Sequence, residues 1–345
     1  MKRTIIMLIV LLAALALRAQ TKYATYWVAP SMAKGMAEKL CFDSLLIVDY
    51  ENLVNNRDEL VEIKRLNPSI KMLLYFNPIE TWEKTLNNRP LANTLRTQIP
   101  KQYFLKRSDK KPVVFWKGMN MLNMSDNCPE VNGKKFNEYY AQWLLAEPLS
   151  DPLVDGCFAD NGTSTISWID PLIDSDNNGR ADSQTELDAS WQKGMTKFFS
   201  LIRQAKGKDY IIITNKGEKF FFFVNNGVMV EKFPNDYLGS TRAGGWYQCI
   251  ENARRSGPYT IFQVDFNHLE FGLASSLLLD NVYICLGQNM QISEKLRIPT
   301  GKPLGKMYKK GNIYCRDYEL VLIEVNPEKK IGKIIPKDLA KVASH

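Results

Sequence analysis

Histidine is scarce in this 345-residue sequence, which contains only His268 and the last residue, His345. Histidine is the usual base of Ser-His-Asp and Cys-His sites and a frequent ligand of catalytic zinc, so either chemistry would depend on His268 alone. The sequence also lacks a G-x-S-x-G motif, and its six cysteines show no C-x-x-C spacing. Nucleophilic triads, zinc sites and metal-dependent deacetylases are therefore disfavoured.

Glycine-rich phosphate loops are missing as well. No G-x-G-x-x-G or G-x-x-x-x-G-K-[ST] motif follows an apolar run, which argues against a nucleotide-binding open sheet. The formal net charge is +8, but the basic residues are scattered in short doublets, and three of them lie in residues 1–20. Because no continuous basic stripe is visible, we expect no nucleic-acid partner.

Long apolar runs are limited to the N-terminus. Residues 1–20 have a basic start, an apolar run over residues 5–17 and then Ala19, which predicts a signal peptide and an exported protein, periplasmic or extracellular. The alternative is a membrane anchor, but a bilayer span needs about 20 apolar residues. We expect no membrane span after cleavage, a monomer, and mostly free thiols, since Cys157 and Cys285 lie in apolar runs.

Short, nearly continuous apolar runs recur along the chain and predict strands that are buried on both faces of a parallel sheet. Helical patterns separate several of them. The predicted strands are residues 23–28, 45–50, 71–76, 156–160, 210–215, 227–233, 259–266 and 281–286, and the predicted helices are residues 56–66, 136–146, 190–205 and 269–279.

Eight strands alternating with helices predict a (β/α)8 TIM barrel over residues 21–300, with a doubly wound open sheet as the alternative. The long connection of about residues 77–132 is expected to be an insertion at the active-site face. Residues 301–345 are predicted to form a C-terminal β extension packed on the barrel, because residues 312–325 have strand character.

Catalytic residues of such barrels lie at the carboxyl ends of strands. Asp160 ends the fourth run and Glu231 lies toward the end of the sixth, both after apolar residues where an unpaired charge is costly. Glycosidic cleavage needs two carboxyl groups, one to protonate the leaving oxygen and one to attack the anomeric carbon or activate water. The alternative is that each carboxylate forms a buried salt bridge, for instance with Lys216 or Lys232.

Several segments, in their order, resemble one known family. They are LIVDYENL, IKRLNPSIKMLLYFNP, DGCFADNG, DxDxNGxxD followed by W-x-x-G-M, IIITNKG, NGVMVEKF and LGKMYKKGNIYCRDYELVLIEVNP. Together they resemble the TIM-barrel enzymes known as hypothetical glycosyl hydrolase family 15. The resemblance covers nearly all of residues 21–345 and implies a barrel fold and glycoside hydrolysis, without indicating the substrate.

An Asp after strand four and an acid after strand six also resemble the layout of several retaining α-glycosidase groups. That resemblance implies Asp160 as nucleophile and Glu231 as general acid/base, while retention or inversion stays open. We predict a wider set of substrate-binding residues from their positions at strand ends or on aromatic loops: Asp49, Tyr50, Asn77, Trp116, Asn161, Asn215 and Asp265. Trp168 is a second stacking candidate, and loop packing is the alternative for either tryptophan.

Residues 174–182 match the first nine positions of a calcium loop, D-x-D-x-N-G-x-x-D. The expected ligands are Asp174, Asp176, Asn178 and Asp182, with the backbone carbonyl of Arg180. Position twelve is Thr185 in place of the usual glutamate, and an Asx-rich surface turn is the alternative. We expect a structural Ca²⁺ near Asp160 and no cofactor for the chemistry itself.

The sequence therefore predicts an exported glycoside hydrolase that acts on poly- or oligosaccharides through Asp160 and Glu231. The alternative from a different class is a catalytically inactive barrel that binds carbohydrate or a protein partner. The two differ in whether the carboxylates are paired, since a binding module needs no such pair.

Overall fold

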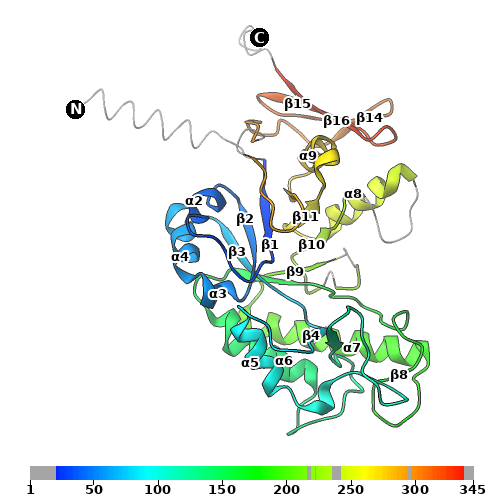
Figure 1. Cartoon of the computed structure of the whole chain (residues 1–345). Coiled ribbons are helices and arrows are strands. Elements are labelled where there is room, and N and C mark those ends of the chain that lie inside the picture. Colours follow the sequence, from blue (N-terminus) through cyan, green and yellow to red (C-terminus); the bar gives the residue numbers. More distant parts are fainter. Residues whose placement is uncertain (1–20, 216–218, 222, 235–241, 294–296, 338–345) are drawn as a thin grey trace. The chain divides into compact units, whose positions relative to one another are not determined.

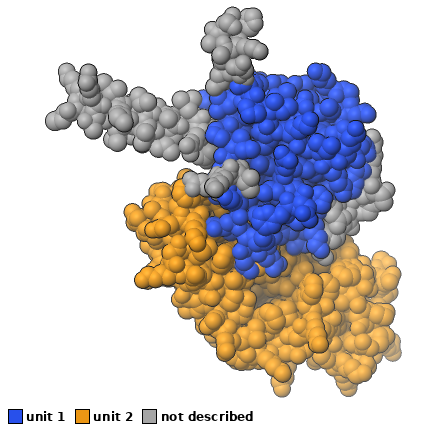
Figure 2. Space-filling model, turned by 45° about the horizontal axis from the view of Figure 1, so that its top comes forward, with its two compact units in different colours: residues 1–25, 230–345 blue, residues 26–229 orange. Residues whose placement is uncertain are grey.

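The computed structural model describes residues 21–215, 219–221, 223–234, 242–293 and 297–337. The chain divides into two compact units, shown in different colours in Figure 2: unit 1 is residues 1–25 with 230–345, and unit 2 is residues 26–229. The predicted signal peptide lies outside the described residues. None of the described helices is long and apolar enough to span a bilayer.

Eight strands form the central sheet in the order β1-β2-β3-β7-β9-β10-β11-β12 (Figure 1). A parallel bridge from Tyr23, just before β1, to Ile284 of β12 joins the first and last strands. The sheet is thus a nearly closed parallel barrel, which confirms the predicted fold class. The strands are β1 Ala24–Trp27, β2 Leu45–Asp49, β3 Lys71–Phe76, β7 Gly156–Ala159, β9 Ile211–Asn215, β10 Gly227–Val230, β11 Thr260–Gln263 and β12 Val282–Cys285, one in each predicted run.

The four predicted helices are all present, and others accompany them. Helix α7 starts six residues before the predicted segment because Ser183 caps it: the Ser183 Oγ accepts the N–H of Glu186 over 3.3 Å. The helices are α2 Ala37–Leu40, α3 Asn52–Asn55, α4 Arg57–Leu66, α5 Pro90–Gln98, α6 Phe136–Ala146, α7 Gln184–Lys206, α8 Trp246–Arg255 and α9 Leu269–Leu277, with 3-10 turns η1 Lys101–Tyr103, η2 Pro148–Ser150, η3 Lys219–Phe221, η4 Arg242–Gly245 and η5 Phe266–His268.

The C-terminal residues form a separate antiparallel sheet within unit 1. The predicted strand segment 312–325 is split into two paired strands, and the lysine-rich tail that follows contributes a further strand that the sequence did not indicate. A predicted β element at this end is therefore confirmed, whereas the predicted boundary at residue 300 stays a prediction. The sheet has the order β13 Tyr308–Lys310, β14 Ile313–Asp317, β15 Val321–Asn326 and β16 Ile331–Pro336.

Each unit has its own hydrophobic core. In unit 2, Phe76 of β3 packs edge-on against Tyr140 of α6 and Phe198 of α7, with ring centroids 6.0 and 6.2 Å apart. In unit 1, Phe233 stacks on Phe262 of β11 at 4.0 Å. The six cysteines, all of them described, form no disulfide in the structure.

The long connection after β3 has little regular structure apart from α5 and short antiparallel pairs. Strand β4 (Glu80–Trp82) pairs with β6 (Met119–Met121), and β5 (Lys106–Arg107) pairs with β8 (Ile173–Asp174) of the connection after β7. The two connections are therefore joined to each other by backbone hydrogen bonds.

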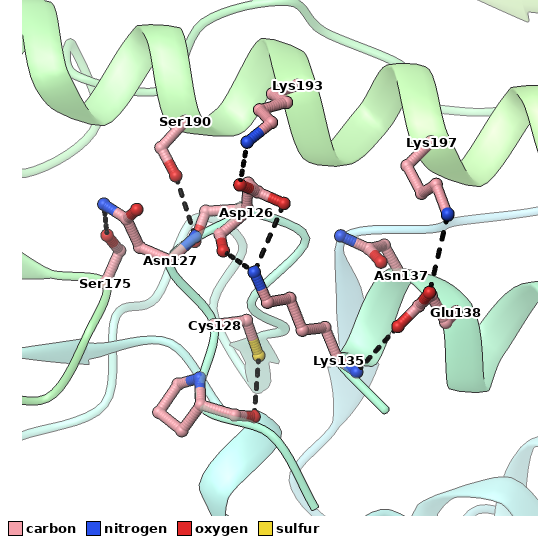
Figure 3. Close-up of polar contacts among 12 residues, drawn as sticks. Asp126, Asn127, Cys128, Lys135, Asn137, Glu138, Ser175, Ser190, Lys193 and Lys197 are labelled. Carbon is pink, nitrogen blue, oxygen red and sulfur yellow. Dashed lines mark hydrogen bonds and ion pairs between the residues drawn. The ribbon is translucent and has the colours of Figure 1, made fainter. Parts of the chain in front are cut away.

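Polar contacts fasten the end of this connection to α6 and α7 (Figure 3). Lys193 Nζ of α7 donates to the Asp126 carboxylate over 2.5 Å, and Lys135 Nζ donates to it over 3.3 Å. Glu138 of α6 receives Lys197 Nζ of α7 at 3.6 Å. Because these side chains are partly exposed, each pair contributes little stability alone, and the network serves to fix the path of the chain.

Gly194 lets α7 approach this connection closely, which yields a first prediction. A Cβ at position 194 would lie 1.8 Å from the Met124 carbonyl oxygen. Gly194→Ala should therefore lower the free energy of unfolding by about 1–3 kcal/mol, although alanine favours helices. Urea denaturation of the variant measures this. Gln204→Ala, at an exposed position of the same helix, is the matched control, and equal stability of the two variants would contradict the close packing.

Candidate active site

Asp160 directly follows β7, and three hydrogen bonds hold its carboxylate. Tyr75 Oη donates to Oδ2 over 2.7 Å, and Asn215 Nδ2 donates to Oδ1 over 2.8 Å. The backbone N–H of Asn161 also donates to Oδ1, at 2.9 Å. Tyr75 lies in β3 and Asn215 ends β9, the two strands that pair with β7. The half-buried carboxylate is thus oriented from both neighbouring strands.

The Tyr75 hydroxyl is suited to remain a donor. Burial raises the pKa of Tyr75 well above its usual value, and the charge of Asp160 raises it further. Tyr75 was not among the predicted site residues, which lie at strand ends or on aromatic loops. Pairing in register with Phe158 places Tyr75 two residues before Asp160 along the sheet, and this register cannot be read from the sequence.

The two predicted asparagines lie beside Asp160. Asn161 adopts a left-handed backbone conformation with φ of 51°, which asparagine tolerates better than most residues. It is buried, as is Asn215. The structure therefore brings together Asp160, Asn161 and Asn215, as the sequence analysis expected from the carboxyl ends of neighbouring strands.

Asp49, at the end of β2, is buried and paired with a cation. Arg89 Nη1 donates to its Oδ2 over 2.9 Å, and the backbone N–H of Glu51 donates to its Oδ1 over 3.0 Å. Burial raises the pKa of Asp49, and the nearby Arg89 partly offsets this. Tyr50 is buried too, with its ring 6.2 Å from that of Trp143. Both residues thus have protein partners, and their predicted contact with substrate stays a prediction.

Glu51 fastens the start of α5. Its two carboxylate oxygens accept the backbone N–H groups of Leu91 and Ala92 over 2.9 and 2.7 Å. Burial raises the pKa of Glu51, while these two hydrogen bonds lower it. Together with the Asp49–Arg89 pair, Glu51 holds the connection after β3 onto the end of β2.

Glu80 of β4 links two of the predicted binding residues and was itself missed. Its Oε2 accepts Asn77 Nδ2 at 3.0 Å, and its Oε1 accepts the backbone N–H of Trp116 at 2.9 Å. Burial raises the pKa of Glu80, and the charge of Asp160 adds to the increase. The sequence carried no signal for this role, because it depends on contact with Trp116, 36 residues further along the chain.

Glu231 and Asp265 belong to unit 1, whereas Asp160 belongs to unit 2. Glu231 directly follows β10 and is half-buried, and Val230 and Phe233, its neighbours in the sequence, are buried. Asp265 is exposed, and its carboxylate accepts the backbone N–H of His268 at 3.0 Å at the start of η5. The catalytic role of Glu231 and the binding role of Asp265 stay predictions.

The predicted calcium loop folds around Asp174, which is buried. One carboxylate oxygen from each of Asp174, Asp176 and Asp182 lies within 4.8 Å of the others. Burial raises the pKa of Asp174, and the neighbouring charge of Asp176 adds to this. Asn178 Nδ2 donates to Asp176 over 2.8 Å, and the Arg180 N–H donates to Asn178 Oδ1 over 2.8 Å. The oxygen-rich cluster fits the preference of Ca²⁺ for carboxylates.

Comparison with solved structures finds similar barrels. A noncanonic maltogenic α-amylase from Thermotoga neapolitana has a TM-score of 0.53 at 9% identity, covering 90% of this chain and 86% of the other. A GH31 dextranase from Flavobacterium johnsoniae has a TM-score of 0.50 at 11% identity, covering 80% of this chain and 37% of the dextranase. At such identities the likeness establishes the fold alone. No curated protein matches the sequence.

Barrels with acidic residues at the ends of their strands occur among glycoside hydrolases. Comparison of the sequence with family models shows that this chain belongs to that class. Residues 64–321 match the model of hypothetical glycosyl hydrolase family 15. The match spans most of the chain, so the protein belongs to this family of enzymes, which hydrolyse O-glycosyl bonds of carbohydrates.

The Asp49–Arg89 pair yields a second prediction. Arg89→Met would leave a buried carboxylate without its cation, which should cost about 3 kcal/mol of unfolding free energy at pH 7. Burial already raises the pKa of Asp49, and loss of Arg89 raises it further. The folded variant then takes up a proton as the pH falls, so the deficit should be smaller at pH 5.

Urea denaturation at both pH values measures this difference. The matched control is Arg65→Met, which removes an exposed ion pair with Glu62 within α4 and should change stability by less than about 1 kcal/mol. A deficit for Arg89→Met that is equally small, or that grows toward pH 5, would show that the pair does not stabilise the fold in this way.

Proposed function

We propose that this glycoside hydrolase cleaves poly- or oligosaccharides with Asp160 as nucleophile and Glu231 as general acid/base. The observation that carries the proposal is the Asp160 carboxylate, which follows a central barrel strand and is oriented by Tyr75 and Asn215. Asn161 and Asn215, with Asn77, are proposed to bind substrate beside it, and Trp116 is proposed to contact the substrate as well. Asp49, Tyr50 and Asp265 are proposed to contact the substrate.

The chemistry proceeds in two steps. Asp160 attacks the anomeric carbon while Glu231 gives its proton to the leaving glycosidic oxygen, so that a glycosyl–enzyme ester forms as the glycosidic bond breaks. Glu231 then takes a proton from water, which attacks the same carbon and releases the sugar and the Asp160 carboxylate. The acid role is supported by the buried apolar residues near Glu231 in the sequence, among them Val230 and Phe233.

We propose further that the loop of residues 174–182 holds a structural Ca²⁺. The clustered oxygens of Asp174, Asp176 and Asp182 support this. So does the anchoring of Ser175, whose carbonyl oxygen accepts Asn123 Nδ2 at 2.6 Å. Such an ion would stiffen the connection after β7 and take no part in bond cleavage.

The proposed setting is outside the cytoplasm. We infer that residues 1–20 direct export and are removed, and that the mature enzyme works as a monomer without a nucleic-acid partner. The basic start and apolar run of the leader and the scattered surface charges support this inference.

The catalytic assignment is tested by hydrolysis of a panel of plant, microbial and host glycans. Starch and dextran are included because one structural relative is named as an α-amylase and the other as a dextranase. Asp160→Asn and Glu231→Gln should each lower kcat by at least about a hundredfold, since each removes a group that forms or protonates a bond in the transition state. The control is Asp58→Asn, which neutralises an exposed carboxylate of α4 and should retain wild-type rates.

Azide rescue distinguishes the nucleophile Asp160 from the general acid/base Glu231. Azide should restore turnover of Asp160→Gly with an activated aryl glycoside, giving a glycosyl azide of inverted configuration, because it replaces the missing nucleophile. Wild-type rates in either carboxylate variant would remove that residue from the mechanism. Binding of glycans without hydrolysis by the wild type would favour an inactive binding module.

The calcium proposal predicts a metal-dependent melting temperature. A ligand that binds only the folded state at a hundred times its Kd adds about 2.7 kcal/mol of stability. Millimolar Ca²⁺ should therefore raise Tm by several degrees, and chelation should reverse the rise. Asp174→Asn should abolish the response, whereas Asp58→Asn should keep it. If Ca²⁺ does not change the Tm of the wild type, the loop is an Asx-rich turn that binds no calcium.

A further inference from the structure

Three aromatic side chains of unit 2 form an exposed cluster. Phe115 lies between Trp116 and Trp168, with ring centroids 5.3 and 5.4 Å away and steep interplanar angles of 64° and 86°. The two tryptophans are 57% and 54% exposed. Large apolar side chains gathered at a protein surface commonly mark a binding site.

The loops that carry this cluster are anchored by buried or half-buried carboxylates. Glu80, only 4% exposed, accepts the backbone N–H of Trp116. Asp188 of α7 accepts the N–H groups of Ile166 and Ser167 over 2.9 and 3.0 Å, just before Trp168. The rings are therefore presented by loops that are held in place before any ligand arrives, which lowers the entropy cost of binding.

The same two loops lead to the candidate active site. Trp116 belongs to the connection after β3, where Glu80 also holds Asn77. Trp168 belongs to the connection that begins at Asp160, after β7. Strands β3 and β7 are paired neighbours, so the loops that carry the aromatic cluster begin at the end of the nucleophile's own strand and at the end of one neighbouring strand.

We propose that Trp116, Phe115 and Trp168 form an aromatic subsite that binds a further sugar ring of the glycan chain. Sugar rings have an apolar face of C–H groups, which packs on the face of an indole, while their hydroxyls remain in water at the edges. The inference rests on the proposed function and adds a substrate class to it: chains long enough to reach this cluster, in preference to disaccharides.

Glu80 acts in this subsite as a positioning residue. Its carboxylate does not face solvent, and it fixes the backbone at Trp116 and the Asn77 amide. Loss of the carboxylate frees the Trp116 backbone from its partner, so the ring loses its fixed direction without being removed.

The subsite is tested by affinity electrophoresis in native gels that contain starch, dextran, xylan, mannan, mixed-linkage β-glucan or pectin. The protein and its Asp160→Asn variant should be retarded by at least one polysaccharide. Trp116→Ala and Trp168→Ala should each weaken the retardation about tenfold in apparent affinity. Phe42→Ala is the matched control, because Phe42 is 56% exposed and precedes β2 at its amino end; it should be retarded like the wild type.

Glu80 is tested in the same gels. Glu80→Ala should weaken retardation, and Glu80→Gln should restore part of it, because glutamine keeps a carbonyl acceptor for the Trp116 N–H. A purely structural role would instead lower the Tm of both variants and leave retardation of the folded protein unchanged.

Failure of the subsite and failure of the catalytic assignment give different results. Unchanged retardation in both tryptophan variants, or no retardation of the wild type in any gel, would overturn the subsite while the hydrolysis results for Asp160 stand. Full hydrolysis by Asp160→Asn would overturn the catalytic assignment, while loss of retardation in the tryptophan variants would still support the subsite.

Discussion

The parallel register of β3, β7 and β9 is the constraint on which the candidate site depends. Tyr75 pairs with Phe158, and Ala159 pairs with Thr214, so Asp160 follows β7 between donors from both neighbours. Gly156 permits this register, because a Cβ there would lie 2.3 Å from the Ile211 carbonyl oxygen. A shift of one residue would turn the donors to the other face of the sheet and leave the carboxylate without them.

Buried carboxylates fix the loops that surround this register. Asp49 binds Arg89, Glu51 binds the start of α5, and Glu80 binds the backbone at Trp116. Each acceptor satisfies N–H groups that an irregular loop cannot satisfy by itself. The scaffold thus supplies rigid strands, and charged side chains together with the short pairs β4–β6 and β5–β8 hold the long connection in place.

Much of the fold was predictable from the sequence, because strands buried on both faces leave continuous apolar runs and every such run became a barrel strand. Asp160 and Asn215 were predictable from their place at strand ends. Tyr75, Glu80 and Arg89 were not, because their roles depend on which strands and loops become neighbours. The early start of α7 depends on a cap at Ser183, and β16 depends on a partner strand that makes a lysine-rich segment extended.

The raised pKa values of Asp49, Glu51 and Glu80 have a common cause in burial and a common thermodynamic consequence. Each carboxyl group holds a proton more firmly in the folded chain than in the unfolded one, so folding is coupled to proton uptake in the mildly acidic range. Their contribution to stability is complete below the unfolded pKa and declines as pH rises through the folded one. These three groups therefore differ from carboxylates with lowered pKa values, whose protonation destabilises a folded protein in acid.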